Sequence, residues 1–74
     1  MPEPRNVITY GRQGRGCFRV RLWHDTGDWN DLGRTISEKT VRTIKQAVDV
    51  ASNWAILYDV RDWDEKKMRL YFSD

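Results

Sequence analysis

Arginines and one tryptophan gather in the early part of the chain, at a spacing that suits anion binding. Residues 4–21 hold five arginines and no acidic residue, although the whole chain has a net charge of only +2. The sharpest cluster comprises Arg12, Arg15, Arg19, Arg21 and Trp23. Guanidinium groups fork onto phosphates, and an aromatic ring can stack on an unpaired base. The cluster predicts a nucleic-acid-binding surface, although the same arginines would also suit the ordinary solvent face of a sheet.

Two of these arginines, Arg12 and Arg15, lie within a glycine-rich segment, residues 11–16 (GRQGRG). It lacks the Gly-Lys-Ser/Thr ending of a P-loop, and a strand pattern follows it where a P-loop needs a helix. Its spacing also differs from the dinucleotide-binding fingerprint. We therefore interpret it as a loop or hairpin turn that lets Arg12 and Arg15 wrap a bound anion from one side.

Acidic residues follow the arginines, in a segment that contains the triplet Asp25-Thr26-Gly27. The triplet matches aspartic proteases, but those enzymes pair two such aspartates within a larger β-rich body. Asp25, Asp28 and Asp31 lack the alternating ligands and closing glutamate of an EF-hand loop. The segment is typical of a plain turn, and no metal site is predicted there.

Cys17 and His24 are the only cysteine and the only histidine in the chain. They exclude a Cys/His zinc cluster within one chain. As a nucleophile and base they would lack a third orienting group and an oxyanion donor. We therefore expect no enzyme activity, no catalytic residues and no cofactor.

The composition favours a folded domain over residues 1–74, with residues 1–5 as a flexible tail. Only 39% of the residues are hydrophobic, but 12% are aromatic, which a disordered chain rarely carries. No apolar run approaches the ~20 residues that span a bilayer, and the segment MPEPRN lacks the apolar core of a secretory signal. With a single thiol, this predicts a soluble cytoplasmic protein without membrane contact.

Apolar spacing divides the rest of the chain into short elements. Residues 6–10 and residues 17–23 read as strands, and the second alternates Phe18, Val20 and Leu22 with polar residues. Residues 29–35 form a weaker strand. Apolar residues over residues 36–58 recur at spacings of three and four, with Trp54 on the apolar side, which predicts a helix capped by Ser37.

The C-terminal segment, residues 67–72, alternates again and predicts a last strand. Its apolar members Met68, Leu70 and Phe72 would join the inner face of the sheet. The resulting fold class is α+β, a small antiparallel sheet of three to four strands (β-β-(β)-α-β) packed on one face by a single amphipathic helix. If the last strand is a sheet edge, it could pair with its twin in a homodimer.

Residues 14–58 resemble the small arm-type DNA-binding domains at the N-terminus of some phage integrases. The resemblance rests on Gly-Arg-Gly-Cys-Phe-Arg-Val-Arg-Leu, then a turn, then a helix over residues 40–54. Those domains place a three-stranded sheet, rich in arginine and aromatic residues, against one helix. The resemblance implies nucleic-acid binding; the predicted strand over residues 67–72 departs from it.

We therefore expect a non-enzymatic binding module whose partner is DNA or RNA. Arg19 and Arg21 would contact phosphates, Arg12 and Arg15 would wrap from the loop, and Trp23 would stack or wedge. The alternative is a protein–protein interaction module or inhibitor of phage or mobile-element type, with tryptophan and arginine anchors on an acidic partner.

Overall fold

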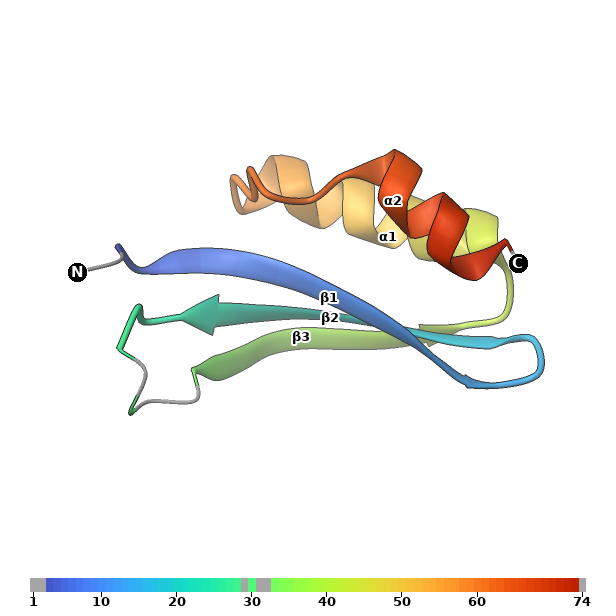
Figure 1. The fold of residues 1–74 in the computed structure, drawn as a ribbon, viewed down its shortest axis with the longest axis horizontal. Helices are drawn as coiled ribbons and strands as arrows, with labels where there is room; N and C mark the ends of the chain where they lie inside the picture. Colours follow the sequence, from blue (N-terminus) through green and yellow to red (C-terminus); the bar gives the residue numbers. More distant parts are fainter. Residues whose placement is uncertain (1–2, 29, 31–32, 74) are drawn as a thin grey trace.

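The computed structural model describes residues 3–28, 30 and 33–73, which form an antiparallel sheet and two helices. The elements are β1 (Arg5–Gly14), β2 (Cys17–Asp25), β3 (Arg34–Val41), α1 (Ile44–Leu57) and α2 (Glu65–Phe72). The strands lie in the order β1-β2-β3, so β2 is central. Both helices lie on one side of the sheet (Figure 1). The predicted α+β fold, with an antiparallel sheet packed against a helix, is confirmed.

Side chains of β2 alternate between the helix layer and the opposite face of the sheet. Val20 and Leu22 are completely buried, and Phe18 packs against the same core. Leu22 lies opposite Ile8 of β1 and opposite Ser37 of β3. The predicted inner face of β2 is therefore confirmed, and its odd-numbered residues lie on the face without helices.

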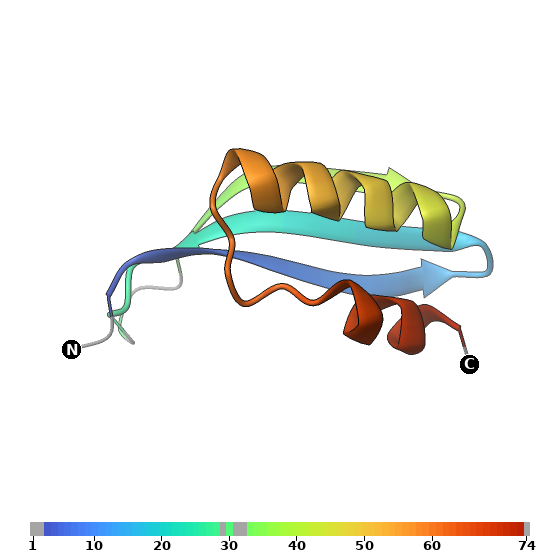
Figure 2. The same cartoon turned by 90° about the horizontal axis from the view of Figure 1, so that it is seen from above.

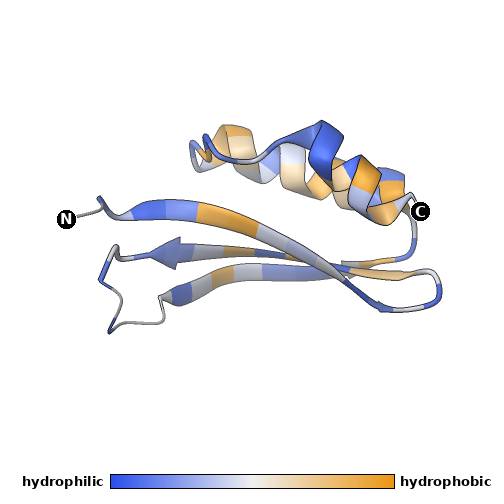
Figure 3. Cartoon of the chain, in the orientation of Figure 1, coloured by the Kyte–Doolittle hydropathy of each residue, from blue (hydrophilic) through white to orange (hydrophobic). Residues whose placement is uncertain are grey.

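The helices close the core over different strands. Figure 2 shows α1 over β2 and β3, while α2 lies beside β1. Apolar stretches mark α1 and the middle of β1, whereas the first turn of α2 is hydrophilic (Figure 3). Trp54 is 8% exposed, as expected of a core residue. The buried core consists of Ile8, Val20, Leu22, Ala47, Val48, Ala51, Trp54, Val60, Met68 and Phe72.

Helix α1 begins later than the sequence pattern predicts. Thr43 is the N-cap, and its hydroxyl accepts a hydrogen bond from the backbone N–H of Gln46 at 3.1 Å. The side chain of Gln46 in turn accepts from the backbone N–H of Arg42 at 3.1 Å. The prediction of a helix from residue 36 with Ser37 as its cap is wrong, because this part of the chain is β3. Threonine, isoleucine and valine are frequent there, and such β-branched residues favour strands.

The first and third strands also differ from their predicted bounds. β1 begins at Arg5, within the predicted tail, and continues to Gly14. The chain therefore turns only around Arg15 and Gly16, where Gly16 has a φ of 60° that glycine adopts without strain. Of the predicted strand over residues 29–35, positions 29, 31 and 32 lie outside the described residues. Arg34 and Thr35 belong to β3.

The predicted C-terminal strand is wrong, because residues 65–72 form helix α2. Asp64 caps this helix by accepting from the backbone N–H of Lys66 at 2.9 Å. Met68 and Phe72 are buried, as predicted, but Leu70 is 73% exposed. Positions 68 and 72 share one helix face, whereas position 70 points away. A homodimer that pairs this segment with its twin as neighbouring strands is therefore not supported, because the segment is a helix.

Substitution of the α2 residues distinguishes a helix from a strand in solution. We expect Met68→Ala to lower the free energy of unfolding by about 2–5 kcal/mol, because it empties a buried site. Leu70→Ala should change it by less than about 0.5 kcal/mol, because Leu70 is exposed. Urea denaturation followed by tryptophan fluorescence measures both. Equal losses for the two variants would contradict the helix.

Candidate nucleic-acid interface

The face of the sheet opposite the helices, called the outer face here, carries three cross-strand rows. One row joins Thr9, Arg21 and Glu38, and the next joins Gly11, Arg19 and Thr40. The third row joins Val7, Trp23 and Thr35. The register shift between Leu22 and Trp23 leaves Ile36 as an extra residue in β3, which brings Thr35 opposite Trp23.

Arg19 and Arg21 share one carboxylate at the centre of the outer face. The Nε of Arg19 lies 2.7 Å from Oε1 of Glu38, and Nη2 of Arg21 lies 3.5 Å from Oε2 of the same side chain. Both arginine side chains remain 41% exposed. The Nε of Arg21 is shielded from solvent and has no hydrogen-bond partner among the described residues. Glu38 therefore holds two partly exposed guanidinium groups side by side.

Trp23 lies at one end of the outer face, where the backbone of Gly33 passes close to its ring. A Cβ atom placed on Gly33 would lie 2.9 Å from Cε3 of Trp23 and 2.5 Å from the carbonyl oxygen of His24. Gly33 also has a φ of 82°, which side chains rarely adopt. The glycine is therefore required for this close approach, and it helps to position the partly buried indole.

The other two predicted site residues lie elsewhere. Arg12 belongs to the face that bears the helices, and its guanidinium donates to the backbone carbonyl of Phe72 at 2.6 Å. It thereby satisfies a carbonyl at the C-terminus of α2, where a cation is also favoured by the helix dipole. Arg15 is exposed in the turn between β1 and β2. The structure thus brings together only Arg19, Arg21 and Trp23.

Two shallow depressions adjoin on the outer face. One, of about 190 Å³, is lined by Thr9, Arg21, Trp23 and residues 33–35. The other, of about 220 Å³, is lined by residues 9–11, Arg19 and Arg21. Thr9 and Arg21 line both depressions, so the two form one continuous surface along β2.

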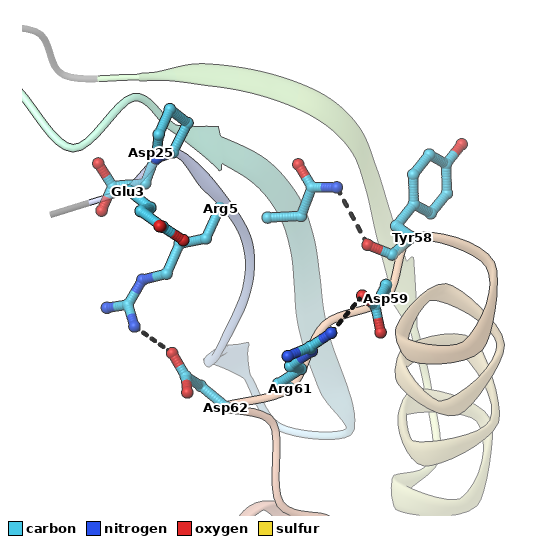
Figure 4. A pocket seen from close by; sticks show the side chains of 9 residues that line it. Glu3, Arg5, Asp25, Tyr58, Asp59, Arg61 and Asp62 are labelled. Carbon is cyan, nitrogen blue, oxygen red and sulfur yellow. Dashed lines mark hydrogen bonds and ion pairs between the residues drawn. The ribbon is translucent and has the colours of Figure 1, made fainter.

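A larger cleft, of about 700 Å³, lies between the start of β1 and the segment after α1 (Figure 4). Four of its charged side chains form two pairs: Arg5 forms an ion pair with Asp62, and Arg61 lies 3.4 Å from Asp59. The side-chain amide of Asn6 donates to the carbonyl of Tyr58 at 3.1 Å. These contacts fasten the end of α1 to β1, and they account for the polar lining of the cleft.

Cys17 and His24 lie at opposite ends of β2, so they do not form a nucleophile–base pair. Seven residues of extended chain separate them by about 23 Å. Nδ1 of His24 lies 3.0 Å from Oδ1 of Asn6, whose amide also contacts the Tyr58 carbonyl.

In the part of the chain that the structure describes, no three His, Cys, Asp or Glu side chains are grouped as metal ligands. No helix in that part is long and apolar enough to cross a membrane.

Glu38 is a residue of this surface that the sequence pattern assigns wrongly, because it falls within the predicted first turn of the helix. Its contacts with Arg19 and Arg21 join residues far apart in the chain. A local signal did exist, since Thr43 and Gln46 have the Thr-x-x-Gln spacing of a capping box, whereas nothing follows Ser37 in that way. A helix that begins after Thr43 leaves Glu38 in the strand that precedes it.

Comparison of the chain with protein-family models, with curated proteins and with solved structures finds no match.

The contact between Gly33 and Trp23 can be tested by adding one methyl group. We expect Gly33→Ala to lower the free energy of unfolding by about 1–3 kcal/mol, because the new Cβ meets backbone and ring and the φ is unfavourable. Gly11→Ala is the matched control, since its Cβ would meet nothing within 4 Å, and its effect should stay below about 1 kcal/mol. Thermal and urea denaturation measure both. Similar effects of the two variants would contradict the close approach.

Proposed function

We propose that this protein is a non-enzymatic module that binds nucleic acid through the outer face of its sheet. One observation carries the proposal: Arg19 and Arg21 project side by side from the central strand onto the face that bears no helix in the described chain. Guanidinium groups recognise phosphates and the acceptor atoms of bases with paired hydrogen bonds. A rigid sheet holds them at a defined spacing, which a disordered basic segment does not.

The dimensions of the sheet favour duplex DNA over an RNA helix. Neighbouring strands lie about 4.8 Å apart, so three strands span about 10 Å between the outer two. The major groove of B-DNA is about 12 Å wide and admits a two-stranded β-ribbon, the width of β2 with one neighbouring strand, whereas the deep major groove of A-form RNA is too narrow for side chains to read. The resemblance of residues 14–58 to arm-type DNA-binding domains of phage integrases supports the same partner.

The remaining arginines and the tryptophan have different supporting roles in this proposal. Arg15, exposed in the turn, is placed to reach a phosphate beyond the end of the sheet. Trp23 offers an apolar surface at the opposite end of β2. Arg12 does not lie on the outer face and contributes to binding only indirectly, because its hydrogen bond to the Phe72 carbonyl holds α2 against the sheet.

A protein partner is the second candidate, and exposed apolar residues on the helix layer support it. Ile56 is 81% exposed and Leu57 is 75% exposed, both at the end of α1. Exposed apolar side chains that gather at one place mark protein interaction sites in many soluble proteins. Salt separates the candidates, because phosphate binding weakens steeply with salt whereas an apolar contact does not.

The outer face is tested by removing its two central charges. We expect the double variant Arg19→Gln plus Arg21→Gln to bind short duplex DNA at least about tenfold more weakly at moderate salt. The slope of log affinity against log salt should fall by about 2, since two cationic side chains no longer displace counterions from the DNA. Fluorescence anisotropy of labelled duplexes at several salt concentrations gives both quantities.

A matched control removes two arginines of the same kind from other surfaces. Arg61 and Arg69 are exposed and each pairs with a carboxylate, as the outer-face arginines do. The variant Arg61→Gln plus Arg69→Gln should keep most of the affinity and nearly the same salt slope. Equal losses in the two double variants, with both proteins folded by circular dichroism, would contradict the assignment of the outer face.

A further inference from the structure

Glu38 is an unexpected residue at the centre of a surface that binds phosphates. Its carboxylate lies between Arg19 and Arg21, is 34% exposed, and would repel a phosphate that approached both guanidinium groups. Exposed ion pairs contribute little to stability, so holding the fold together does not explain it well. A surface that only attracted the DNA backbone would bind better without this carboxylate.

The three side chains bring two groups of hydrogen-bond donors and one carboxylate acceptor together. Each guanidinium has five N–H donors, of which Glu38 and, for Arg19, the side-chain amide oxygen of Gln13 use some. The carboxylate of Glu38 offers acceptor positions beyond its two contacts. In the major groove, guanine exposes two acceptors, O6 and N7, and cytosine exposes the N4 amino donor. An A·T pair presents a different pattern, because its donor lies on the purine and its pyrimidine offers an acceptor and a methyl group. Arginine can donate to both guanine acceptors at once and glutamate can accept from the cytosine amino group, so these residue types suit G·C pairs.

The spacing along the strands agrees with the spacing of base pairs. Residues two apart on a strand are separated by about 6.7 Å, which equals about two base-pair steps of 3.4 Å. Arg19 and Arg21 can thus reach guanines in different base pairs. Glu38 lies directly opposite Arg21 on the neighbouring strand.

We propose that Glu38 is a specificity-determining residue that accepts a hydrogen bond from a cytosine amino group while Arg19 and Arg21 donate to guanines. The outer face then selects G·C pairs in the major groove of duplex DNA. This inference rests on the proposed function, since it concerns the same surface. The repulsion between Glu38 and phosphate adds to the selectivity, because it weakens binding that uses the backbone alone.

The test compares short duplexes of equal length that contain only G·C or only A·T pairs. The unaltered protein should prefer the G·C duplex by about tenfold or more, as one well-formed base contact does. Replacing guanine by 7-deazaguanine, which lacks the N7 acceptor, should remove most of that preference. Glu38→Gln should bind both duplexes more tightly and gain most on A·T, because glutamine pairs well with adenine.

Glu65→Gln is the control for the charge change. Glu65 pairs with Arg69 at 2.9 Å on α2, so its loss alters the net charge equally without touching the outer face. It should raise the affinity for both duplexes slightly and by the same factor. A purely structural role of Glu38 would likewise leave the ratio of the two affinities unchanged, which makes that ratio the decisive readout.

The possible failures are distinguishable. No salt-sensitive binding to any duplex, with the protein folded, would overturn the proposed function and this inference with it. Equal affinity of the unaltered protein for G·C and A·T duplexes would leave the proposed function intact and overturn the role of Glu38. An equal gain on both duplexes for Glu38→Gln would also overturn it, because the carboxylate would then act only by repulsion.

Discussion

Burial of one face of β2 is the constraint on which the rest of the molecule depends. Val20 and Leu22 are completely buried beneath the helix layer. Because neighbouring side chains on a strand point to opposite faces, this burial directs Arg19, Arg21 and Trp23 to the other side. A shift of one residue in the register would bury the arginines and expose the core, at a large cost in free energy. The position of the arginines is therefore secured by hydrophobic packing that they do not themselves take part in.

The small size of the domain explains why both helices are needed on one face. Seventy-four residues bury a limited core, and α1 lies over only part of the sheet. Phe72 of α2 extends the core, because the centre of its ring lies 5.5 Å from that of Tyr10 on β1 and 4.7 Å from that of Phe18 on β2. Arg12 fastens this end of α2 through the Phe72 carbonyl. With both helices on one side, no helix of the described chain covers the outer face (Figure 1).

Sequence patterns predict those parts of this fold in which local and long-range requirements agree. β2 alternates cleanly, so its start, its inner face and the shared side of Arg19 and Arg21 follow from period two alone. The strand continues two residues beyond its predicted end at position 23, to Asp25. The C-terminal segment fails because Met68 and Phe72 satisfy both a period of two and a helical spacing of four. The start of α1 fails because Ser37 and Glu38 look like a cap and a first turn, although the β-branched residues around them form a strand. The role of Arg12 and the position of Glu38 depend on contacts between distant parts of the chain, which no local pattern contains.

The most direct test of the central claim is to locate the bound nucleic acid by nuclear magnetic resonance. The ¹⁵N-labelled protein would be titrated with a short G·C-containing duplex, and the backbone amide signals followed residue by residue. We predict that the largest shifts occur at Thr9, Arg21 and Glu38 and at their neighbours on the three strands, with little change at Ile56 or Lys67. Shifts concentrated on α1 and α2, with the sheet signals unchanged, would contradict the account and identify the helix layer as the binding surface.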